Sequence, residues 1–321
     1  MQARLRIGTR SSPLALAQTR MVKARLIAAH GELDDAAVRI VEIKTTGDKV
    51  LDRTLMAIGG KGLFTKELEE ALLDGRIDCA VHSAKDMPTA LPDGLDLVCF
   101  PEREDPRDAF ISHTVPGLDA LPAGAVVGTA SLRRRAQLLR LRPDLEVVAF
   151  RGNVGTRLRK LKDGQAHATV LALAGLRRLG LEHAATALMG PPDTLPAPAQ
   201  GAICVEARAG DQATAALLAP LNDAATAACV AAERAFLAAL DGSCRTPIAA
   251  LARLDGADLQ LAGRLLSPDG RQCFDVDRTG PVADATRLGA DAGATLRGRA
   301  GAAFFQQLAE AMAAEADRAV R

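Results

Sequence analysis

The sequence predicts an α/β protein with two domains around a hinged cleft and a smaller α+β third domain. Short apolar runs alternate with helical segments over the first half of the chain, which is typical of a sheet covered by helices. A densely charged segment at 102–108 and a proline-rich segment at 191–198 interrupt this alternation. Two crossings between the same two domains are typical of a hinge. A chain of 321 residues has room for two or three domains.

The first domain begins with a strand at Leu5–Gly8, followed by a helix from about Leu14 to Ala29. Ser12 can cap this helix because its hydroxyl accepts from a free backbone N–H group, and Pro13 suits the first helical position. The junction beside Arg10 is therefore a candidate anion site. The remaining elements expected here are strands at 38–43 and 95–100, a glycine-rich loop at 58–64, a helix at 65–73 and a buried strand ending at 81.

The second domain repeats the strand–helix alternation, with Ser131 as the cap of a helix that begins at Leu132. After the linker at 191–198, a strand at 200–206 returns the chain to the first domain. The third domain begins with a helix at 223–240, which Gly242 ends in the left-handed conformation. Strands from 248 to 277 and a helical tail follow. We expect domain 1 at residues 1–101 and 200–219, domain 2 at 102–199 and domain 3 at 220–321.

Charge and composition exclude several functions. The net charge is +1 and 2% of the residues are aromatic, so neither a basic surface nor aromatic platforms for nucleic acid are expected. No apolar run approaches the roughly 20 residues of a membrane span, and the N-terminus lacks the apolar core of a signal peptide. We therefore expect a cytoplasmic protein with no nucleic-acid or membrane partner, and we expect a monomer.

The six cysteines lack the Cys-x-x-Cys spacing of a metal site, and no metal is expected. Cys79, Cys99, Cys204 and Cys229 lie in apolar runs and are expected in the core. Cys244 lies in a turn-rich loop beside an arginine, where a thiol can be reactive. An ordinary exposed thiol is the alternative.

The densest group of chemically active side chains follows the strand that ends at residue 81. His82, Lys85 and Asp86 come directly after it, at the carboxyl end of a strand, where open α/β sheets bind ligands. The proline at 88 prevents a helix and favours an extended residue before it. We therefore expect Asp86 on a short, stiff loop that faces a cleft. A surface turn in which Lys85 and Asp86 form a charge pair is the alternative.

Basic residues are concentrated in the second domain. Residues 131–162 contain eight arginines and two lysines against Asp144 and Glu146. Several of them, such as Arg133 and Arg157, follow predicted strand ends at helix N-termini, where the helix dipole disfavours cations. An anionic ligand explains this placement, because arginine binds carboxylates and phosphates with two bonds. A solvated basic face is the alternative.

Together these stretches resemble the porphobilinogen deaminase family, also named hydroxymethylbilane synthases, over nearly the whole chain. Each motif could occur by chance, but the full set in this order is specific. The motifs are Ile-Gly-Thr-Arg-Ser-Ser-Pro-Leu-Ala-Leu at 7–16, Gly-Gly-Lys-Gly-Leu-Phe at 59–64, Val-His-Ser-Ala-Lys-Asp-Met-Pro at 81–88, Glu-Arg-Glu-Asp-Pro-Arg-Asp at 102–108, Ser-Leu-Arg-Arg at 131–134, Arg-Gly-Asn-Val-Gly-Thr at 151–156 and Gly-Ser-Cys at 242–244. Ala84 and Met87 replace other small or apolar residues of the family, and the residues from 282 onward match it poorly.

The resemblance implies that the first two domains are similar to periplasmic binding proteins. It implies a transferase that condenses four porphobilinogen molecules head to tail with release of ammonia and then hydrolyses off hydroxymethylbilane. It also implies a dipyrromethane cofactor, joined by a thioether to the loop cysteine, which here is Cys244. Each porphobilinogen carries an acetate and a propionate, which suits the many arginines of the second domain.

The resemblance also assigns roles to individual residues. It implies that Asp86 is the catalytic aspartate, which stabilises a cationic intermediate and moves a proton. The cofactor-binding residues that it implies are Cys244, Lys85, Ser131, Arg133, Arg134 and Arg157. The substrate-binding residues that it implies are Arg10, Ser12, Arg151, Arg178 and Gln200. A non-catalytic module that binds a small anion on the same scaffold is the alternative, but such a module has no use for a pyrrole anchored at Cys244.

Overall fold

The computed structural model describes residues 4–45, 65–242 and 246–318. The glycine-rich loop predicted at 58–64 and the cysteine at 244 therefore lie outside the described residues. The chain divides into two compact units. The first unit comprises Met1–Asp52, Gly60–Glu104 and Gly201–Ala227, and the second comprises Arg53–Gly59, Asp105–Gln200 and Ala228–Arg321.

The first unit is built on a five-stranded sheet. Its strands are β1 (Leu5–Arg10), β2 (Val38–Ile43), β3 (Cys79–Ser83), β4 (Leu95–Cys99) and β10 (Ile203–Arg208). They lie in the order β2-β1-β3-β10-β4, with β1 parallel to β2 and β3, and β10 antiparallel to β3 and β4. β10 thus returns the chain to the sheet of β1, as the sequence predicts, although it begins only at Ile203.

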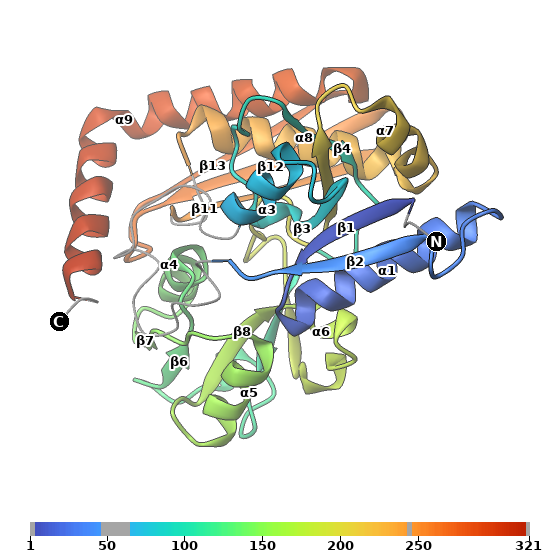
Figure 1. Ribbon diagram of the computed structural model, residues 1–321. Helices are drawn as coiled ribbons and strands as arrows, with labels where there is room; N and C mark the ends of the chain where they lie inside the picture. Colours follow the sequence, from blue (N-terminus) through green and yellow to red (C-terminus); the bar gives the residue numbers. More distant parts are fainter. Residues whose placement is uncertain (1–3, 46–64, 243–245, 319–321) are drawn as a thin grey trace. The chain divides into compact units, whose positions relative to one another are not determined.

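Helices cover the two faces of this sheet (Figure 1). Successive residues of a strand point to opposite faces, so Val81 of β3 contacts one helix and Ala80 the other. On the side of Val81, α1 (Pro13–Ala29) contributes Val22 and Leu26 to the core. On the side of Ala80, α3 (Lys66–Leu73) contributes Leu68 and Leu72. A short helix, α7 (Gln212–Leu218), follows β10.

The second unit contains a sheet of the same design. Its strands are β5 (Asp108–Ile111), β6 (Val126–Gly128), β7 (Glu146–Val148), β8 (Ala168–Ala172) and β9 (Ala187–Met189). They lie in the order β7-β6-β8-β5-β9, with β6 parallel to β7 and β8, and β5 antiparallel to β8 and β9. Phe110 of β5 packs on the side of α4 (Leu132–Leu141), and its neighbours Ala109 and Ile111 pack with α5 (Val154–Lys162) and α6 (Leu173–Arg178).

A third, antiparallel sheet belongs to the second unit. It consists of β11 (Ile248–Asp255), β12 (Asp258–Leu266) and β13 (Cys273–Pro281) in that order. The helices α8 (Ala224–Ala239) and α9 (Ala285–Arg318) share its hydrophobic core, in which Phe236 and Leu296 are fully buried. α9 is bent at Gly301, where φ is 74°. The predicted α+β character of the C-terminal part and its helical tail are therefore confirmed.

The end of α8 differs from the prediction. The left-handed residue is Asp241, with a φ of 50°, and not Gly242. The Gly242 amide donates to the carbonyl oxygen of Leu237. A Cβ at Gly242 would lie 2.4 Å from Cδ1 of Ile248 and 2.5 Å from Cδ1 of Leu237, so these two side-chain tips would have to move to admit a larger residue. The mixed α/β class with a smaller third part is confirmed, whereas the hinged cleft between the first two domains stays a prediction.

Candidate functional site

Polar residues at the ends of β1 and β3 line a cavity of about 70 Å³ in the first unit. The two strands are adjacent and parallel, so their carboxyl ends meet at one edge of the sheet, where α/β proteins bind ligands. The polar residues that line the cavity are Arg10, Ser12, Gln18, Thr65, His82, Ser83 and Asp86. The structure thus brings together three predicted site residues, namely Arg10 and Ser12 after β1 and the distant Asp86 after β3.

Two local structures, the capped start of α1 and the turn after β3, border this cavity. Ser12 accepts a hydrogen bond from the Ala15 amide (3.3 Å) at the start of α1, as predicted. β3 continues into a single 3₁₀ turn, η1 (Ala84–Asp86), and Met87 after it is extended. An extended residue before Pro88 is what the proline ring requires. The short loop predicted for Asp86 is therefore confirmed, and Asp86 is exposed where it borders the cavity.

A buried acid–imidazole pair lies in the wall of this cavity. His82 Nε2 is 3.1 Å from Glu206 Oε2, and the two side chains are 4% and 0% exposed. The pKa of Glu69 on α3 is raised. Burial is the main cause, and the negative charge of nearby Glu206 contributes as well. Glu206 was not among the candidate residues of the sequence analysis. The sequence feature that could have identified it is an acidic residue inside the apolar run Ile203–Ala207.

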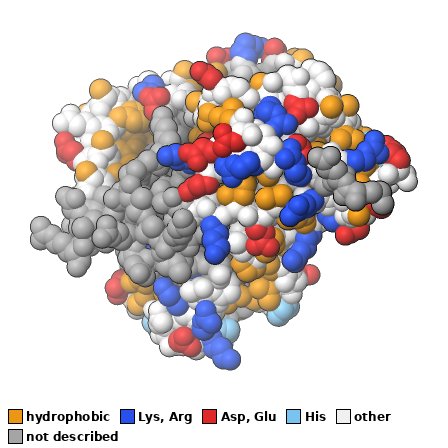
Figure 2. Space-filling view, in the orientation of Figure 1, with side chains coloured by type: hydrophobic (Ala, Val, Ile, Leu, Met, Phe, Trp, Pro, Cys, Tyr) orange, Lys and Arg blue, Asp and Glu red, His pale blue; other side chains and the backbone are white. Residues whose placement is uncertain are grey.

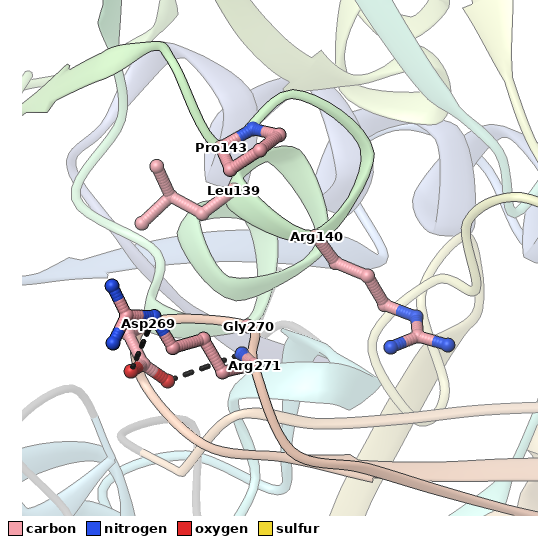
Figure 3. Close-up of a pocket in the computed structure, with 6 residues that line it drawn as sticks. All are labelled: Leu139, Arg140, Pro143, Asp269, Gly270 and Arg271. Carbon is pink, nitrogen blue, oxygen red and sulfur yellow. Dashed lines mark hydrogen bonds and ion pairs between the residues drawn. The ribbon is translucent and has the colours of Figure 1, made fainter.

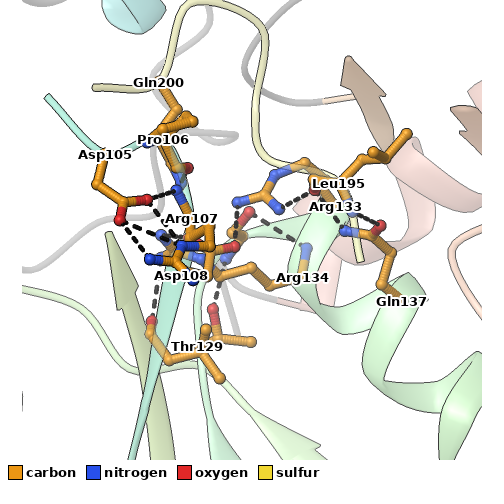
Figure 4. A network of polar contacts seen from close by, with 12 residues as sticks. Asp105, Pro106, Arg107, Asp108, Thr129, Arg133, Arg134, Gln137, Leu195 and Gln200 are labelled. Atoms are coloured by element: carbon orange, nitrogen blue, oxygen red, sulfur yellow. Dashed lines mark hydrogen bonds and ion pairs between the residues drawn. The ribbon is translucent and has the colours of Figure 1, made fainter. Parts of the chain in front are cut away.

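A second polar cluster is centred on Asp108 in the second unit (Figure 4). Asp108 begins β5 and is buried together with Arg133 and Arg134 from the first turn of α4. Arg133 Nη2 and Arg134 Nη2 donate to its two oxygens at 2.8 and 2.7 Å, and Gln200 Nε2 donates at 2.8 Å. Arg133 and Arg134 were predicted to bind an external anion. In the structure they bind the carboxylate of Asp108, which was not predicted as a site residue.

The charges of this cluster depend on one another. Burial alone would raise the pKa of Asp108, but the charges of Arg133 and Arg134 outweigh it and hold that pKa well below its usual range. Burial lowers the pKa of Arg133, and Asp108 opposes this effect. The Nε atoms of Arg133 and Arg134 are buried and have no hydrogen-bond partner among the described residues. Two cations share one internal carboxylate here, and further donors of both go to the carbonyl oxygens of Leu195 and Val170.

The other predicted site residues of the second unit lie at helix ends. Ser131 caps α4 and accepts from the Arg134 amide at 3.4 Å. Arg157 Nε donates to the Gly152 carbonyl oxygen at 2.9 Å, and Arg151 is half-buried just before α5. Arg178 is half-buried in the last turn of α6, so it is not at a helix N-terminus. Lys85 belongs to the first unit, where it is half-buried in η1 next to Asp86.

The cysteines of the apolar runs are core residues, as predicted. Cys79, Cys99, Cys204 and Cys229 are all buried. Burial raises the pKa of Cys99 to about 12 and raises the pKa of Cys79 as well. The thiols of Cys79 and Cys99 are therefore protonated and unreactive at neutral pH. Cys244 lies outside the described residues.

A larger cavity, of about 390 Å³, lies where the turn after β12 meets α4 (Figure 3). Its lining residues are Leu139, Arg140, Pro143, Asp269, Gly270 and Arg271. The contact is close, because a Cβ at Gly270 would lie 2.3 Å from the carbonyl oxygen of Ala136. The third sheet therefore touches the backbone of the helix that carries Arg133 and Arg134.

On the face drawn in Figure 2, basic, acidic and apolar side chains are mixed, in keeping with the net charge of +1. Across 4–45, 65–242 and 246–318, no three His, Cys, Asp or Glu side chains gather so that they could hold a metal ion. In the same residues, no single helix is long and apolar enough to cross a membrane. One bent pair of helices, Gln212–Leu221 with Ala224–Ala239, has the length and apolar composition of a membrane span, and only length and composition indicate this.

This is an α/β protein whose first unit places a cation and a hydroxyl group beside an exposed carboxylate at one sheet edge. The family model described as "Porphobilinogen deaminase, dipyromethane cofactor binding domain" matches residues 5–216, and the model of the porphobilinogen deaminase C-terminal domain matches 227–298. Porphobilinogen deaminase from Paracoccus denitrificans is 59% identical over 301 residues, which are 94% of this chain and 96% of that protein. The chain belongs to the porphobilinogen deaminase family.

This membership confirms the family, the transferase function and the dipyrromethane cofactor predicted from the sequence. It does not support the alternative of a non-catalytic anion-binding module. Solved binding proteins also align with part of the chain. A methionine-binding protein aligns with a TM-score of 0.43 and 15% identity over 68% of this chain and 89% of its own. A periplasmic substrate-binding protein from Coxiella burnetii aligns with a TM-score of 0.42 and 16% identity over 72% and 96%. This likeness says nothing of the ligand.

Proposed function

We propose that the cavity of Arg10, Ser12 and Asp86 is the site at which porphobilinogen is bound and activated. The observation that supports this is the meeting of a cation, a hydroxyl group and an exposed carboxylate at one sheet edge. Arg10 and Ser12 are suited to a carboxylate of the substrate, because a guanidinium and a helix N-terminus both favour anions. Asp86 then faces the pyrrole ring rather than the acidic side chains.

Asp86 acts on the substrate in two ways. Its carboxylate accepts a hydrogen bond from the pyrrole N–H and so stabilises the positive charge that develops when ammonia leaves the aminomethyl group. Once the new carbon–carbon bond has formed, the same carboxylate takes the proton from the ring carbon. Because Asp86 lies on a short turn between β3 and Pro88, it can serve every round of addition in one place.

We assign the cofactor to the second cluster together with Lys85 and Cys244. The dipyrromethane carries carboxylates, and the guanidinium groups of Arg133 and Arg134 in the first turn of α4 are assigned to them. Ser131 and Arg157 extend this set, and Cys244 supplies the thioether. When bound, the cofactor provides the pyrrole carbon on which the product grows. Arg151, Arg178 and Gln200 are assigned to the substrate chain, and Gln200 in addition holds Asp108 through its amide nitrogen.

The attachment of the cofactor is tested by intact mass. The purified protein should carry a covalent adduct of two pyrrole units, and Cys244→Ser should lack it because an alcohol is a far weaker nucleophile than a thiolate. Cys273→Ser is the matched control, since Cys273 is a half-exposed cysteine of the same unit. An adduct retained in Cys244→Ser, or lost in Cys273→Ser, contradicts the assignment.

The role of Asp86 is tested by two substitutions. Asp86→Asn keeps the shape of the side chain but removes its charge, and it should lower the rate on the order of 100–1,000-fold. Asp86→Glu keeps the charge one methylene away and should retain more activity. Asp93→Asn is the control, because Asp93 is exposed in the same unit and does not line the cavity. Near-normal turnover of Asp86→Asn would remove it from the mechanism.

Three broader expectations belong to the same proposal. The division into domain 1 (1–101 and 200–219), domain 2 (102–199) and domain 3 (220–321) is supported by the three separate sheets. A monomer should sediment with a mass close to 33.5 kDa. A cytoplasmic enzyme without membrane or nucleic-acid partners should be recovered in the cytosolic fraction after cell lysis and nuclease treatment. Sedimentation as a dimer or recovery with membranes contradicts these expectations.

A further inference from the structure

The pair His82–Glu206 is an unusual feature of the core of the first unit. Glu206 lies diagonally across from His82 on the antiparallel strands β10 and β3, because the register pairs His82 with Cys204 and Ala80 with Glu206. Glu206 is completely buried, and its Oε1 has no hydrogen-bond partner among the described residues. Burying a carboxylate with a single partner is costly. Packing of the sheet alone therefore does not explain this pair.

The surroundings of the pair favour the binding of a proton. Glu69 of α3 is nearly buried, its Oε1 also lacks a partner among the described residues, and its pKa is raised. Two carboxylates that share a dry site with one imidazole cannot both ionise without cost. Glu67 on α3 also acts on this cluster. Arg10 and Asp86 line the adjoining cavity, and Lys85 precedes Asp86 in η1.

One step of the reaction needs such a group. Porphobilinogen loses the nitrogen of its aminomethyl group as ammonia, its methylene carbon forms the new carbon–carbon bond, and the attacked ring carbon later loses its proton to Asp86. Asp86 must be deprotonated again before the next addition, and the proton must end on ammonia or water. His82 and Asp86 line the same cavity, which brings the histidine and the carboxyl that has to be reset to one site.

We propose that His82, oriented by Glu206, receives the ring proton from Asp86 and passes it to the ammonia already released in that round, which resets Asp86 for the next round. This proposal rests on the role of Asp86 given above. The ring C–H bond breaks and its electron pair restores the aromatic pyrrole. The proton moves to a carboxylate oxygen of Asp86, then to His82 and then to ammonia, which leaves as ammonium. No oxidant or reductant is required.

Glu206 decides which imidazole nitrogen can serve. A carboxylate at Nε2 holds the proton on that nitrogen, so Nδ1 is the one that accepts and releases the transferred proton. The same division between an orienting carboxylate and a working nitrogen is found in catalytic triads. His82 thus acts on the substrate through Asp86 and is a positioning and proton-relay residue.

The test compares the first addition with the later ones. In His82→Gln, Asp86 is intact for the first addition, so ammonia should be released in a burst of about one equivalent per enzyme. Later additions should then be slower on the order of 100-fold, with KM little changed. His30→Gln is the matched control, because His30 is a half-buried histidine of the same unit that is bonded to the Leu217 carbonyl oxygen away from the cavity.

A second readout separates a relay from a purely structural pair. Glu206→Gln leaves the imidazole in place but removes the carboxylate that orients it, so the later additions should be slowed while the first addition keeps its burst. Loss of thermal stability alone, with the rates of all additions unchanged, is what a purely structural pair would produce and would overturn the proposal.

A third measurement uses the unmodified enzyme and therefore does not depend on whether the variants fold. If proton relay limits the later additions, the solvent deuterium isotope effect should be larger on them than on the first. Equal isotope effects, or equal slowing of all additions in His82→Gln, contradict the relay. Slow first addition in Asp86→Asn together with normal later additions in His82→Gln would refute the relay but keep the role of Asp86. Near-normal Asp86→Asn would refute both.

Discussion

The sheet of the first unit runs β2-β1-β3-β10-β4 and the large sheet of the second unit runs β7-β6-β8-β5-β9. In both, three parallel strands are followed by one antiparallel strand that carries a buried acid, Glu206 on β10 and Asp108 on β5. Asp108 accepts from two guanidinium groups and an amide. Glu206 is bonded to a single imidazole.

This difference indicates two uses of a buried acid on the antiparallel strand. Asp108 accepts from two guanidinium groups, which stay charged at every relevant pH, and from one amide, so it fixes the geometry of the cluster. Glu206 is bonded to an imidazole, a group that can both accept and donate a proton, so its pairing with His82 can handle a proton. Four comparisons break or sharpen this contrast, and they are ordered here from the largest expected effect to the smallest.

The largest effect is expected for Asp108→Asn. It leaves Arg133 and Arg134 buried without a counter-charge, and breaking a buried pair in this way costs about 3–5 kcal/mol in the free energy of unfolding. Urea unfolding followed by circular dichroism measures it. Asp144→Asn is the control, because the Arg142–Asp144 pair is partly exposed and should contribute far less. Equal losses in the two variants would mean that Asp108 is not the centre of the cluster.

A smaller effect is expected from two matched glycines, Gly8 of β1 and Gly128 of β6. A Cβ at Gly128 would lie 2.3–2.5 Å from three ring atoms of Phe150, whereas at Gly8 its closest contact is the tip of Ile77, at 2.3 Å. An aromatic ring cannot move as cheaply as a terminal methyl group. Gly128→Ala should therefore cost about 1–3 kcal/mol and Gly8→Ala less, as measured by urea unfolding. The reverse order would contradict this.

The two helix caps should be equal. Ser12 and Ser131 each accept from the backbone amide three residues ahead, at 3.3 and 3.4 Å. Alanine at either position should cost about 1 kcal/mol in thermal or urea unfolding. Threonine, which also caps helices, should restore most of that loss. A cost confined to one of the two alanine variants would show that the units are less alike than their topology.

The smallest effect concerns pH. The pKa of Asp108 is lowered, so its stabilisation is complete above about pH 4 and is lost below it as the carboxyl is protonated. The stability gap between the unmodified protein and Asp108→Asn should therefore narrow in acid. The pKa of Glu69 is raised by burial, which costs stability once the pH exceeds about 4.3.

Glu69→Gln should accordingly be more stable than the unmodified protein at pH 7 and equal to it in acid. Glu70→Gln, an exposed neighbour on the same helix, is the control and should show no such trend. Unfolding curves between pH 3 and pH 8 provide the measurement. If the stability differences of Asp108→Asn and Glu69→Gln from the unmodified protein changed with pH in the same way, there would be no contrast between the two buried acids.

The parts of the fold that depend on neighbouring residues were predictable. The cap of α1 at Ser12 and the turn that carries Asp86 follow from short-range rules for serine and proline. Burial of the four cysteines in apolar runs follows from hydrophobic pattern alone. The left-handed residue after α8 was predicted one position too late. Gly242 instead packs closely against Ile248, which lies in the next strand, and a contact of this kind cannot be identified from local sequence.

Contacts between distant residues were not predictable in the same way. Asp108 stands 25 and 26 residues before the two arginines that it binds, and Glu206 stands 124 residues after His82. Nothing local distinguishes these acids from surface ones, except that each lies next to or within a short apolar run. Arg10, Ser12 and Asp86 were predicted through the family motifs, and the sheet explains why they meet.

The segment at 191–198 has the composition of a flexible linker and contains neither helix nor strand, yet it is tied down along its length. The Leu195 amide donates to Gln137 Oε1 and its carbonyl oxygen accepts from Gln137 and Arg133. The Ala199 amide, just beyond it, donates to the buried Glu233, and the Ala250 amide of β11 donates to Pro196. In amide hydrogen exchange these amides should therefore behave like core positions, opening only with the surrounding unit. A protease that cuts exposed loops should leave this stretch intact in the native protein, despite its four prolines.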